Sequence, residues 1–203
     1  LLVNADGDNF LPDDASYIID SSINSTVERD AIANLRGGGE FGEDWHRQGN
    51  LTNKKNVFDD FAAALEHLIA RGYAAPDRLA IEGRSNGGLL MGALLTRRPD
   101  LARAVVSHVG IYDMLRVELS PNGSFNIPEF GTVKNPEHFK ALYAYSPYHN
   151  VKDGTAYPAT LFLTGVNDPR VDAMQSRKMV ARLQAAPAAG GARCRYLAII
   201  MDG

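Results

Sequence analysis

The sequence has one cysteine and one tryptophan among its 203 residues, and it has no long apolar run. The lone Cys194 cannot form an internal disulfide, and its place in an apolar stretch indicates buried packing rather than redox or nucleophilic chemistry. No segment reaches the roughly 18 consecutive apolar residues of a membrane helix, and residues 1–3 are too short for a signal-peptide core. The formal net charge of -3 gives no polyelectrolyte character, so we expect neither nucleic acid nor a membrane as partner. Compartment and oligomeric state stay open.

What the sequence does contain is an ordinary globular composition, with 45% hydrophobic and 22% charged residues. A chain of this length can bury one sizeable core, so we expect a single domain over residues 1–203. Residues 1–30 are the least legible part, because Asp6-Gly7-Asp8-Asn9 reads as a turn and no clear pair of strands follows. Whether this segment belongs to the same fold is left open.

Apolar runs alternate with amphipathic segments along the rest of the chain. Strands are predicted at 31–35, 78–82, 104–109, 160–164 and 195–201, and helices at 57–70, 87–96 and 172–185. This order predicts an α/β fold with a doubly wound, mostly parallel sheet. Residues 113–150 interrupt the alternation with many Pro, Asn, Gly and aromatic residues, which is typical of loops and short helices around a site.

The segment Gly83-Arg84-Ser85-Asn86-Gly87 matches the G-x-S-x-G pattern where a predicted strand meets a predicted helix. Such a sharp turn strains the backbone of the serine, and the flanking glycines have no Cβ atoms to collide with strand or helix. Ser85 is therefore a candidate nucleophile with an exposed hydroxyl. Because the first N–H groups of a helix are unpaired, the N–H of Asn86 can stabilise the oxyanion that forms when Ser85 attacks a carbonyl. The alternative is a glycine-rich turn with an incidental serine, which the ordered strand, helix and later acid disfavour.

The same segment, extended through Gly88-Leu89-Leu90, resembles the G-G-S-N-G-G-L-L elbow of the prolyl oligopeptidase family and departs from it only at Arg84. Residues 33–42 with Trp45-His46 look like the family's A-N-x-R-G-G-G-E-[FY]-G-x-x-W-H block, and residues 109–116 and 145–151 are similar to later blocks. The resemblance runs from about residue 33 to 185. It implies an α/β-hydrolase fold and a serine peptidase that hydrolyses short peptides after proline through an acyl-enzyme on Ser85, with no metal or organic cofactor.

In an α/β-hydrolase the triad runs in the order Ser, acid, His, and the acid follows a late strand. Asp168 in Asn167-Asp168-Pro169 fits that place and would hold the imidazole in its productive tautomer. All five histidines precede Asp168, so none of them fits the order. The sequence therefore predicts a truncated chain, in which the family's triad histidine and its amino-terminal β-propeller lie outside residues 1–203. The family's upstream tyrosine loop has no match either, so only the Asn86 half of the oxyanion hole carries over.

The resemblance also implies residues that contact the substrate. Arg170 would bind a substrate backbone carbonyl, which suits the fixed donors of a guanidinium. Ile111, Phe130 and Val171 match the apolar walls around the substrate proline. The family's stacking tryptophan has no counterpart, and Phe125 is the candidate substitute, with an ordinary loop aromatic as the alternative. An aromatic face still favours proline, but without the indole we expect a less strict preference.

Two other functions stay open. One is a broader oligopeptidase or acylaminoacyl-type hydrolase, because the same elbow serves other acyl transfers, although Asn86 and Gly88 favour the prolyl branch. The other is a catalytically silent domain that keeps the hydrolase scaffold, which the missing histidine supports.

Overall fold

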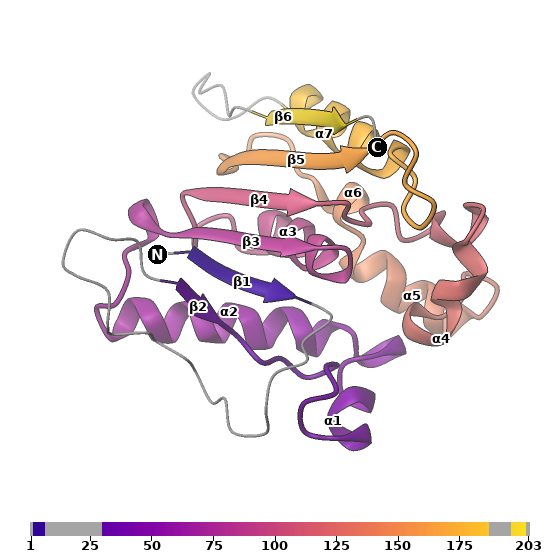
Figure 1. The fold of residues 1–203 in the computed structure, drawn as a ribbon, viewed down its shortest axis with the longest axis horizontal. Coiled ribbons are helices and arrows are strands. Elements are labelled where there is room, and N and C mark those ends of the chain that lie inside the picture. Colours follow the sequence, from indigo (N-terminus) through magenta and orange to yellow (C-terminus); the bar gives the residue numbers. More distant parts are fainter. Residues whose placement is uncertain (1, 7–29, 187–195, 202–203) are drawn as a thin grey trace.

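The computed structural model describes residues 2–6, 30–186 and 196–201. These residues form a six-stranded sheet in the order β2-β1-β3-β4-β5-β6, and every neighbouring pair of strands is parallel (Figure 1). The strands are β1 Leu2–Asp6, β2 Asp30–Ile32, β3 Ala80–Arg84, β4 Ala104–His108, β5 Ala159–Gly165 and β6 Tyr196–Met201. The predicted parallel α/β sheet is confirmed. Strand β1 is an addition, because it lies in the segment that the sequence left open; Cys194 lies outside the described residues.

Three long helices follow the predicted ones closely. They are α2 Lys55–Ala70, α3 Asn86–Arg97 and α7 Met174–Ala185. Helix α2 turns one stripe inward, including Phe58, Phe61 and Leu65. Helix α3 is different, since all its residues from Gly87 to Thr96 are buried. A helix that is apolar all round belongs at the centre of a domain, and α3 lies between the sheet and its neighbouring helices.

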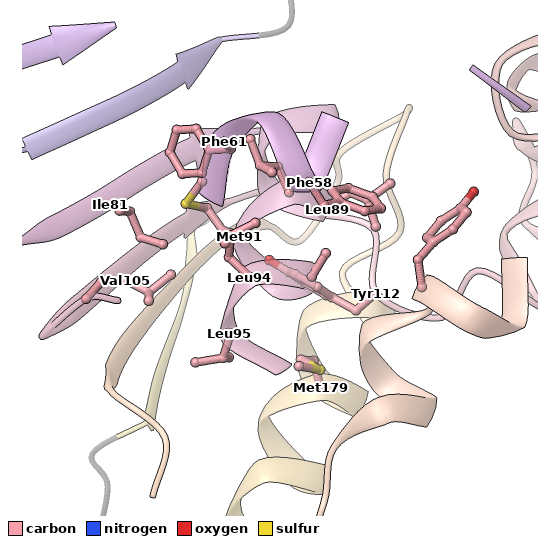
Figure 2. Packing of buried hydrophobic residues seen from close by; sticks show 14 of the residues in the cluster. Phe58, Phe61, Ile81, Leu89, Met91, Leu94, Leu95, Val105, Tyr112 and Met179 are labelled. Carbon is pink, nitrogen blue, oxygen red and sulfur yellow. The ribbon is translucent and has the colours of Figure 1, made fainter. Parts of the chain in front are cut away.

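The core lies between these helices and one face of the sheet. Strands β3 and β4 alternate strictly, with Ile81 and Val105 buried and Glu82 and Val106 half-buried on the opposite side. Figure 2 shows Ile81 and Val105 beside residues of α2 and α3 such as Phe61, Met91 and Leu94, all of which belong to this cluster. The period of two along the strands and the apolar helix stripes therefore meet in one cluster.

The remaining elements are short. They include α1 Glu43–Arg47, α4 Ile127–Phe130, α5 Pro136–Tyr145, α6 Pro147–Asn150 and the 3-10 helices η1 Leu51–Asn53, η2 Pro76–Arg78, η3 Val117–Leu119 and η4 Gly123–Asn126. Helices α4 to α6 lie beyond the carboxyl ends of the central strands (Figure 1), so the predicted insertion of loops and short helices is confirmed. None of the described helices is both long and apolar enough to cross a membrane.

Candidate active site

Ser85 lies between the end of β3 and the start of α3, as the sequence predicted. Its backbone has φ 56° and ψ -111°, a conformation that L-residues rarely adopt and that is typically held at functional sites. Ser85 is the N-cap residue of α3, but its hydroxyl makes no capping hydrogen bond, and the residue is exposed. A serine at this place usually caps its helix, so here the hydroxyl stays available for chemistry.

Gly83 and Gly88, on either side of the turn, are required because a side chain at either position would collide with neighbouring backbone. A Cβ atom on Gly83 would overlap the carbonyl oxygen of Gly87, and a Cβ atom on Gly88 would lie 2.5 Å from the Cα of Gly110. Real Cβ atoms essentially never come so close. The close approach of β3, α3 and the end of β4 thus requires glycine, and the predicted elbow geometry over residues 83–87 is confirmed.

Backbone strain continues on the neighbouring strand. Val109, directly after β4, has φ 41°, which is an outlier for a β-branched residue. Its N–H donates to the carbonyl oxygen of Leu163 at 2.7 Å, so the strained residue is held from the β5 side. Two strained residues, Ser85 and Val109, therefore lie at the same edge of the sheet, a feature that is common at functional sites.

Asn86 is the first residue of α3, where N–H groups have no intrahelical acceptor and the helix dipole favours negative charge. Its side-chain Nδ2 donates to Oε1 of Glu129 at 3.3 Å. The same oxygen accepts a hydrogen bond of 2.6 Å from Nζ of Lys54, a lysine that is only 2% exposed. The side chain of Asn86 therefore points toward the ion pair of buried Lys54 and half-buried Glu129, and its backbone N–H belongs to the positive end of α3.

Asp168 lies in the loop that follows β5. Its Oδ1 accepts hydrogen bonds from the N–H groups of Arg170 at 2.8 Å and Val171 at 3.0 Å, which fix the carboxylate in the turn. Because β3 and β5 are parallel and both pair with β4, Ser85 and Asp168 each follow a strand that ends at the same edge of the sheet.

A pocket of about 260 Å³ adjoins the Asp168 loop. Its lining includes Asp168 and Arg170 from this loop, and Ser120 and Asn122 from the segment between η3 and η4. The side chain of Asn122 donates to the carbonyl oxygen of Pro169, which ties the segment between η3 and η4 to this loop. Of the four predicted polar site residues, Asp168 and Arg170 thus share one concave surface, whose lining does not include Ser85 or Asn86.

The predicted apolar walls divide into two groups. Ile111, Phe130 and Val171 are buried, at 4%, 3% and 8% exposure, and belong to the main hydrophobic cluster. Phe125 on η4 is 90% exposed, so its ring is not packed into that cluster. Three of the four predicted wall residues therefore lie in the core, and Phe125 lies on the surface.

Four of the five histidines have partners other than Ser85 and Asp168. The hydrogen bonds are His46 with the carbonyl oxygen of Gly37 (2.8 Å), His108 with Glu82 (2.6 Å), His138 with the N–H of Thr132 (3.3 Å) and His149 with Ser146 (2.8 Å). The fifth, His67, is an exposed residue of α2 and also has a partner. Across the part of the chain that the structure describes, no three His, Cys, Asp or Glu residues are grouped to hold a metal ion.

Sequence reasoning missed Lys54 and Glu129. Lys54 stands beside Lys55 in the sequence, yet Lys54 is buried and Lys55 is exposed. Nothing in the sequence indicates which of the two adjacent lysines is buried. Glu129 lies directly before the predicted wall residue Phe130, and only the fold brings its carboxylate to Asn86.

Comparisons with known proteins agree with this geometry. The prolyl oligopeptidase family model matches residues 30–201. The prolyl endopeptidase of Dictyostelium discoideum is 48% identical over 154 residues, which cover 75% of this chain and 20% of that protein. A structure from an analysis of two prolyl endopeptidases superposes with a TM-score of 0.83 at 42% identity, covering 98% of this chain and 30% of that one. Prolyl oligopeptidase B from Galerina marginata, bound to a 35mer hydrolysis and macrocyclization substrate, has a TM-score of 0.79 at 39% identity, covering 84% of this chain and 24% of its own. The chain thus spans about a fifth to a third of the length of these relatives.

Proposed function

Because this chain belongs to the prolyl oligopeptidase family and has the α/β-hydrolase fold, we propose that its protein is a serine peptidase that hydrolyses short peptides after proline. The observation that carries the proposal is Ser85, strained at φ 56° between β3 and α3 with a hydroxyl not used for capping. A strained serine at this junction is how such a fold presents a nucleophile. The relatives named above, which include prolyl endopeptidases, support the substrate class.

In the proposed mechanism the Oγ atom of Ser85 attacks the carbonyl carbon of the residue before the scissile bond. The negative charge that develops on the carbonyl oxygen is stabilised by the N–H of Asn86 at the positive end of α3. A histidine takes the serine proton and returns it to the leaving amine, while Asp168 holds that histidine in the required tautomer. No histidine follows Asp168 in residues 1–203, and we place this base outside them. Water then hydrolyses the acyl-enzyme by the same route.

Specificity is proposed to come from two kinds of contact. The proline ring would pack against the small part of Ile111, Phe130 and Val171 that stays exposed, and Arg170 would donate to a substrate carbonyl. Phe125 is the aromatic residue that could cover the ring, and its 90% exposure means that it would have to be buried by the substrate itself.

A second candidate, a broader oligopeptidase, is favoured by that same exposure. The exposed ring of Phe125 must be ordered when substrate binds, and this costs conformational entropy. It therefore gives a weaker preference for proline than an aromatic wall that is already packed in place. The ratio of kcat/KM for matched peptides with proline or alanine before the scissile bond separates the two. A ratio near one would favour the broader enzyme.

The experiment for the main proposal uses the protein expressed from the complete gene and a Gly-Pro chromogenic peptide. Ser85→Ala should lower kcat about a millionfold, as loss of the nucleophile does in serine proteases. Ser124→Ala, which removes the exposed hydroxyl of η4, is the matched control and should leave kcat unchanged. A wild-type protein that cleaves no peptide or ester would instead favour the silent domain.

A further inference from the structure

Lys54 occupies a place that is unfavourable for a cation in two ways. Its side chain is only 2% exposed, and Lys54 is the N-cap residue of α2, next to the positive end of the helix dipole, which disfavours a cation. Burial lowers the pKa of Lys54, while the charge and hydrogen bond of Glu129 act in the opposite direction. Replacing both members of a buried ion pair by apolar side chains of similar size is often neutral for stability, so the pair calls for another explanation.

The carboxylate of Glu129 gathers groups from distant parts of the chain. Its Oε1 accepts from Nζ of Lys54 at 2.6 Å and from Nδ2 of Asn86 at 3.3 Å. Its Oε2 lies 3.8 Å from Nε2 of His46, whose other ring nitrogen is held by the carbonyl oxygen of Gly37. With a side chain 24% exposed, Glu129 is fixed chiefly by these partners.

The link to Asn86 matters because Asn86 is the first residue of α3 and follows directly on the strained Ser85, whose side chain makes no capping hydrogen bond. The contact with Glu129 anchors the side chain of Asn86 and so limits rotation of the peptide unit that carries its N–H. Hydrogen bonds to a developing oxyanion depend steeply on donor geometry, so a small rotation there lowers the rate.

Lys54 also contacts the proposed substrate wall. Its Nζ lies 5.3 Å from the centroid of the Phe130 ring, within the range of a cation–π contact. The buried ammonium group of Lys54 therefore contacts both the carboxylate of Glu129, which holds Asn86, and the ring of Phe130, the next residue in the sequence.

We propose that Lys54 and Glu129 are positioning residues, which hold Asn86 so that its N–H is preset for the oxyanion, and that they act on kcat rather than on substrate binding. The inference rests on the proposed function. The acceptor oxygen on residue 129 is the atom that acts on Asn86, and Lys54 keeps it in place.

The test compares two double variants of the protein expressed from the complete gene. Lys54→Met with Glu129→Gln removes both charges but keeps an acceptor for Asn86, whereas Lys54→Met with Glu129→Leu removes the charges and the acceptor. Both replace the ion pair by uncharged groups of similar volume, so neither leaves a buried charge unpaired. We expect kcat for a Gly-Pro peptide to be about tenfold or more lower in the Leu variant than in the Gln variant, with KM values within about threefold. Equal kcat values in two folded variants would overturn the proposal.

The control ion pair lies on the same helix. Asp59 of α2 accepts from Arg97 at 2.7 Å, at the other end of α3 from Asn86. Asp59→Asn should leave both kcat and KM within about twofold of the wild type, as expected for surface pairs. A drop in kcat equal to that of the Leu variant would mean that any ion pair on α2 acts on the site, and would also overturn the proposal.

A fluorophosphonate probe separates failure of the inference from failure of the proposed function. The Oγ of Ser85 forms a bond to phosphorus and fluoride leaves, while the serine proton passes to the base; the phosphoryl oxygen takes the place of the oxyanion. If the wild type is labelled but cleaves no prolyl peptide, the proposed peptidase activity is wrong, and slower labelling of the Leu than of the Gln variant still supports positioning. Equal labelling rates would refute positioning by itself.

Discussion

The backbone N–H of Ser85 donates a 2.9 Å hydrogen bond to the carbonyl oxygen of His108, the last residue of β4. The strained turn is thus tied to the neighbouring strand rather than resting on β3 and α3 alone. Together with the contact of Gly88 against Gly110, this bond explains how an unfavourable backbone conformation persists.

Gly88→Ala should destabilise the protein by about 2–3 kcal/mol, because the new Cβ would lie 2.5 Å from the Cα of Gly110 and 2.8 Å from the carbonyl oxygen of His108. Backbone atoms on both sides cannot move away without displacing β4. Gly39→Ala is the matched control, since nothing lies within 4 Å of its added Cβ. Urea unfolding of the two variants measures the difference, and similar stabilities would contradict the close approach.

Asp168→Asn should lower kcat about ten-thousandfold with little change in stability, because an amide oxygen can still accept from Arg170 and Val171 but cannot stabilise an imidazolium. Asp172→Asn makes the same change in a similar turn, where Oδ1 accepts from the N–H of Met174 at 2.8 Å. Its kcat should match that of the wild type. Asp168 would be removed from the mechanism if both variants kept full activity.

The two single variants of the buried pair should differ in stability. Glu129→Gln leaves the ammonium of Lys54, 2% exposed, without its counter-charge and should cost about 3 kcal/mol or more. Lys54→Met should cost less, about 1 kcal/mol, because Glu129 is partly exposed and still accepts from Asn86. Thermal melting of both against the wild type gives the comparison, and a larger loss for Lys54→Met would mean that the burial argument is wrong.

His149 should make the protein less stable in mild acid. Burial lowers its pKa from 6.5, the charges of Arg116 and Lys178 act in the same direction, and Asp113 opposes them. The unfolded chain therefore binds a proton at higher pH than the folded chain, so this stability is present above pH 6.5 and is lost as the pH falls below 6.5 toward the depressed value. His149→Gln should flatten that part of the stability curve, and an unchanged slope in the variant would count against it.

Asp113 should act in a separate, more acidic window. Burial works against its charged form, yet the hydrogen bond and charge of Lys178 hold the pKa of Asp113 below 3.8. The contribution of Asp113 to the free energy of unfolding is thus fully present above pH 3.8 and is lost as the pH falls through its pKa in the folded state. Lys178→Met should move the acid unfolding midpoint to higher pH, which circular dichroism during acid titration would record.

The sequence could predict those structural features whose determinants lie within a few neighbouring residues. The elbow was predictable because Gly83 and Ser85 each answer a local demand of one turn, and the structure confirms the turn and the close contact at Gly83. Strand β1 was not, since five residues with no helical or alternating flank carry little periodic signal. Helix α5 was not predicted, although the sequence carries a local signal for its start. Asn135 caps the helix by accepting hydrogen bonds from the N–H groups of Glu137 and His138, and Pro136 occupies the first helical position.

The site shows the same limit. Asp168 could be predicted from its place after a late strand, although its role in catalysis stays a prediction. Lys54 and Glu129 could not, because they are 75 positions apart and meet only through tertiary structure. The exposure of Phe125 was equally beyond reach, since an aromatic in a loop has the same sequence whether it packs inward or outward.

The strand order β2-β1-β3-β4-β5-β6 also has a consequence for how the chain folds. Strand β1 lies between β2 and β3, and Leu2 pairs with Ala80, so the pairing of β1 with β3 can form only after the residues between them have been made and folded back. Closing such a loop costs entropy before any contact repays it, and contacts between distant residues slow folding. We therefore expect the β1–β3 pairing to acquire protection from hydrogen exchange late in refolding, after β3, β4 and the helix between them, and β1 to lack this partner while the chain is still emerging from the ribosome.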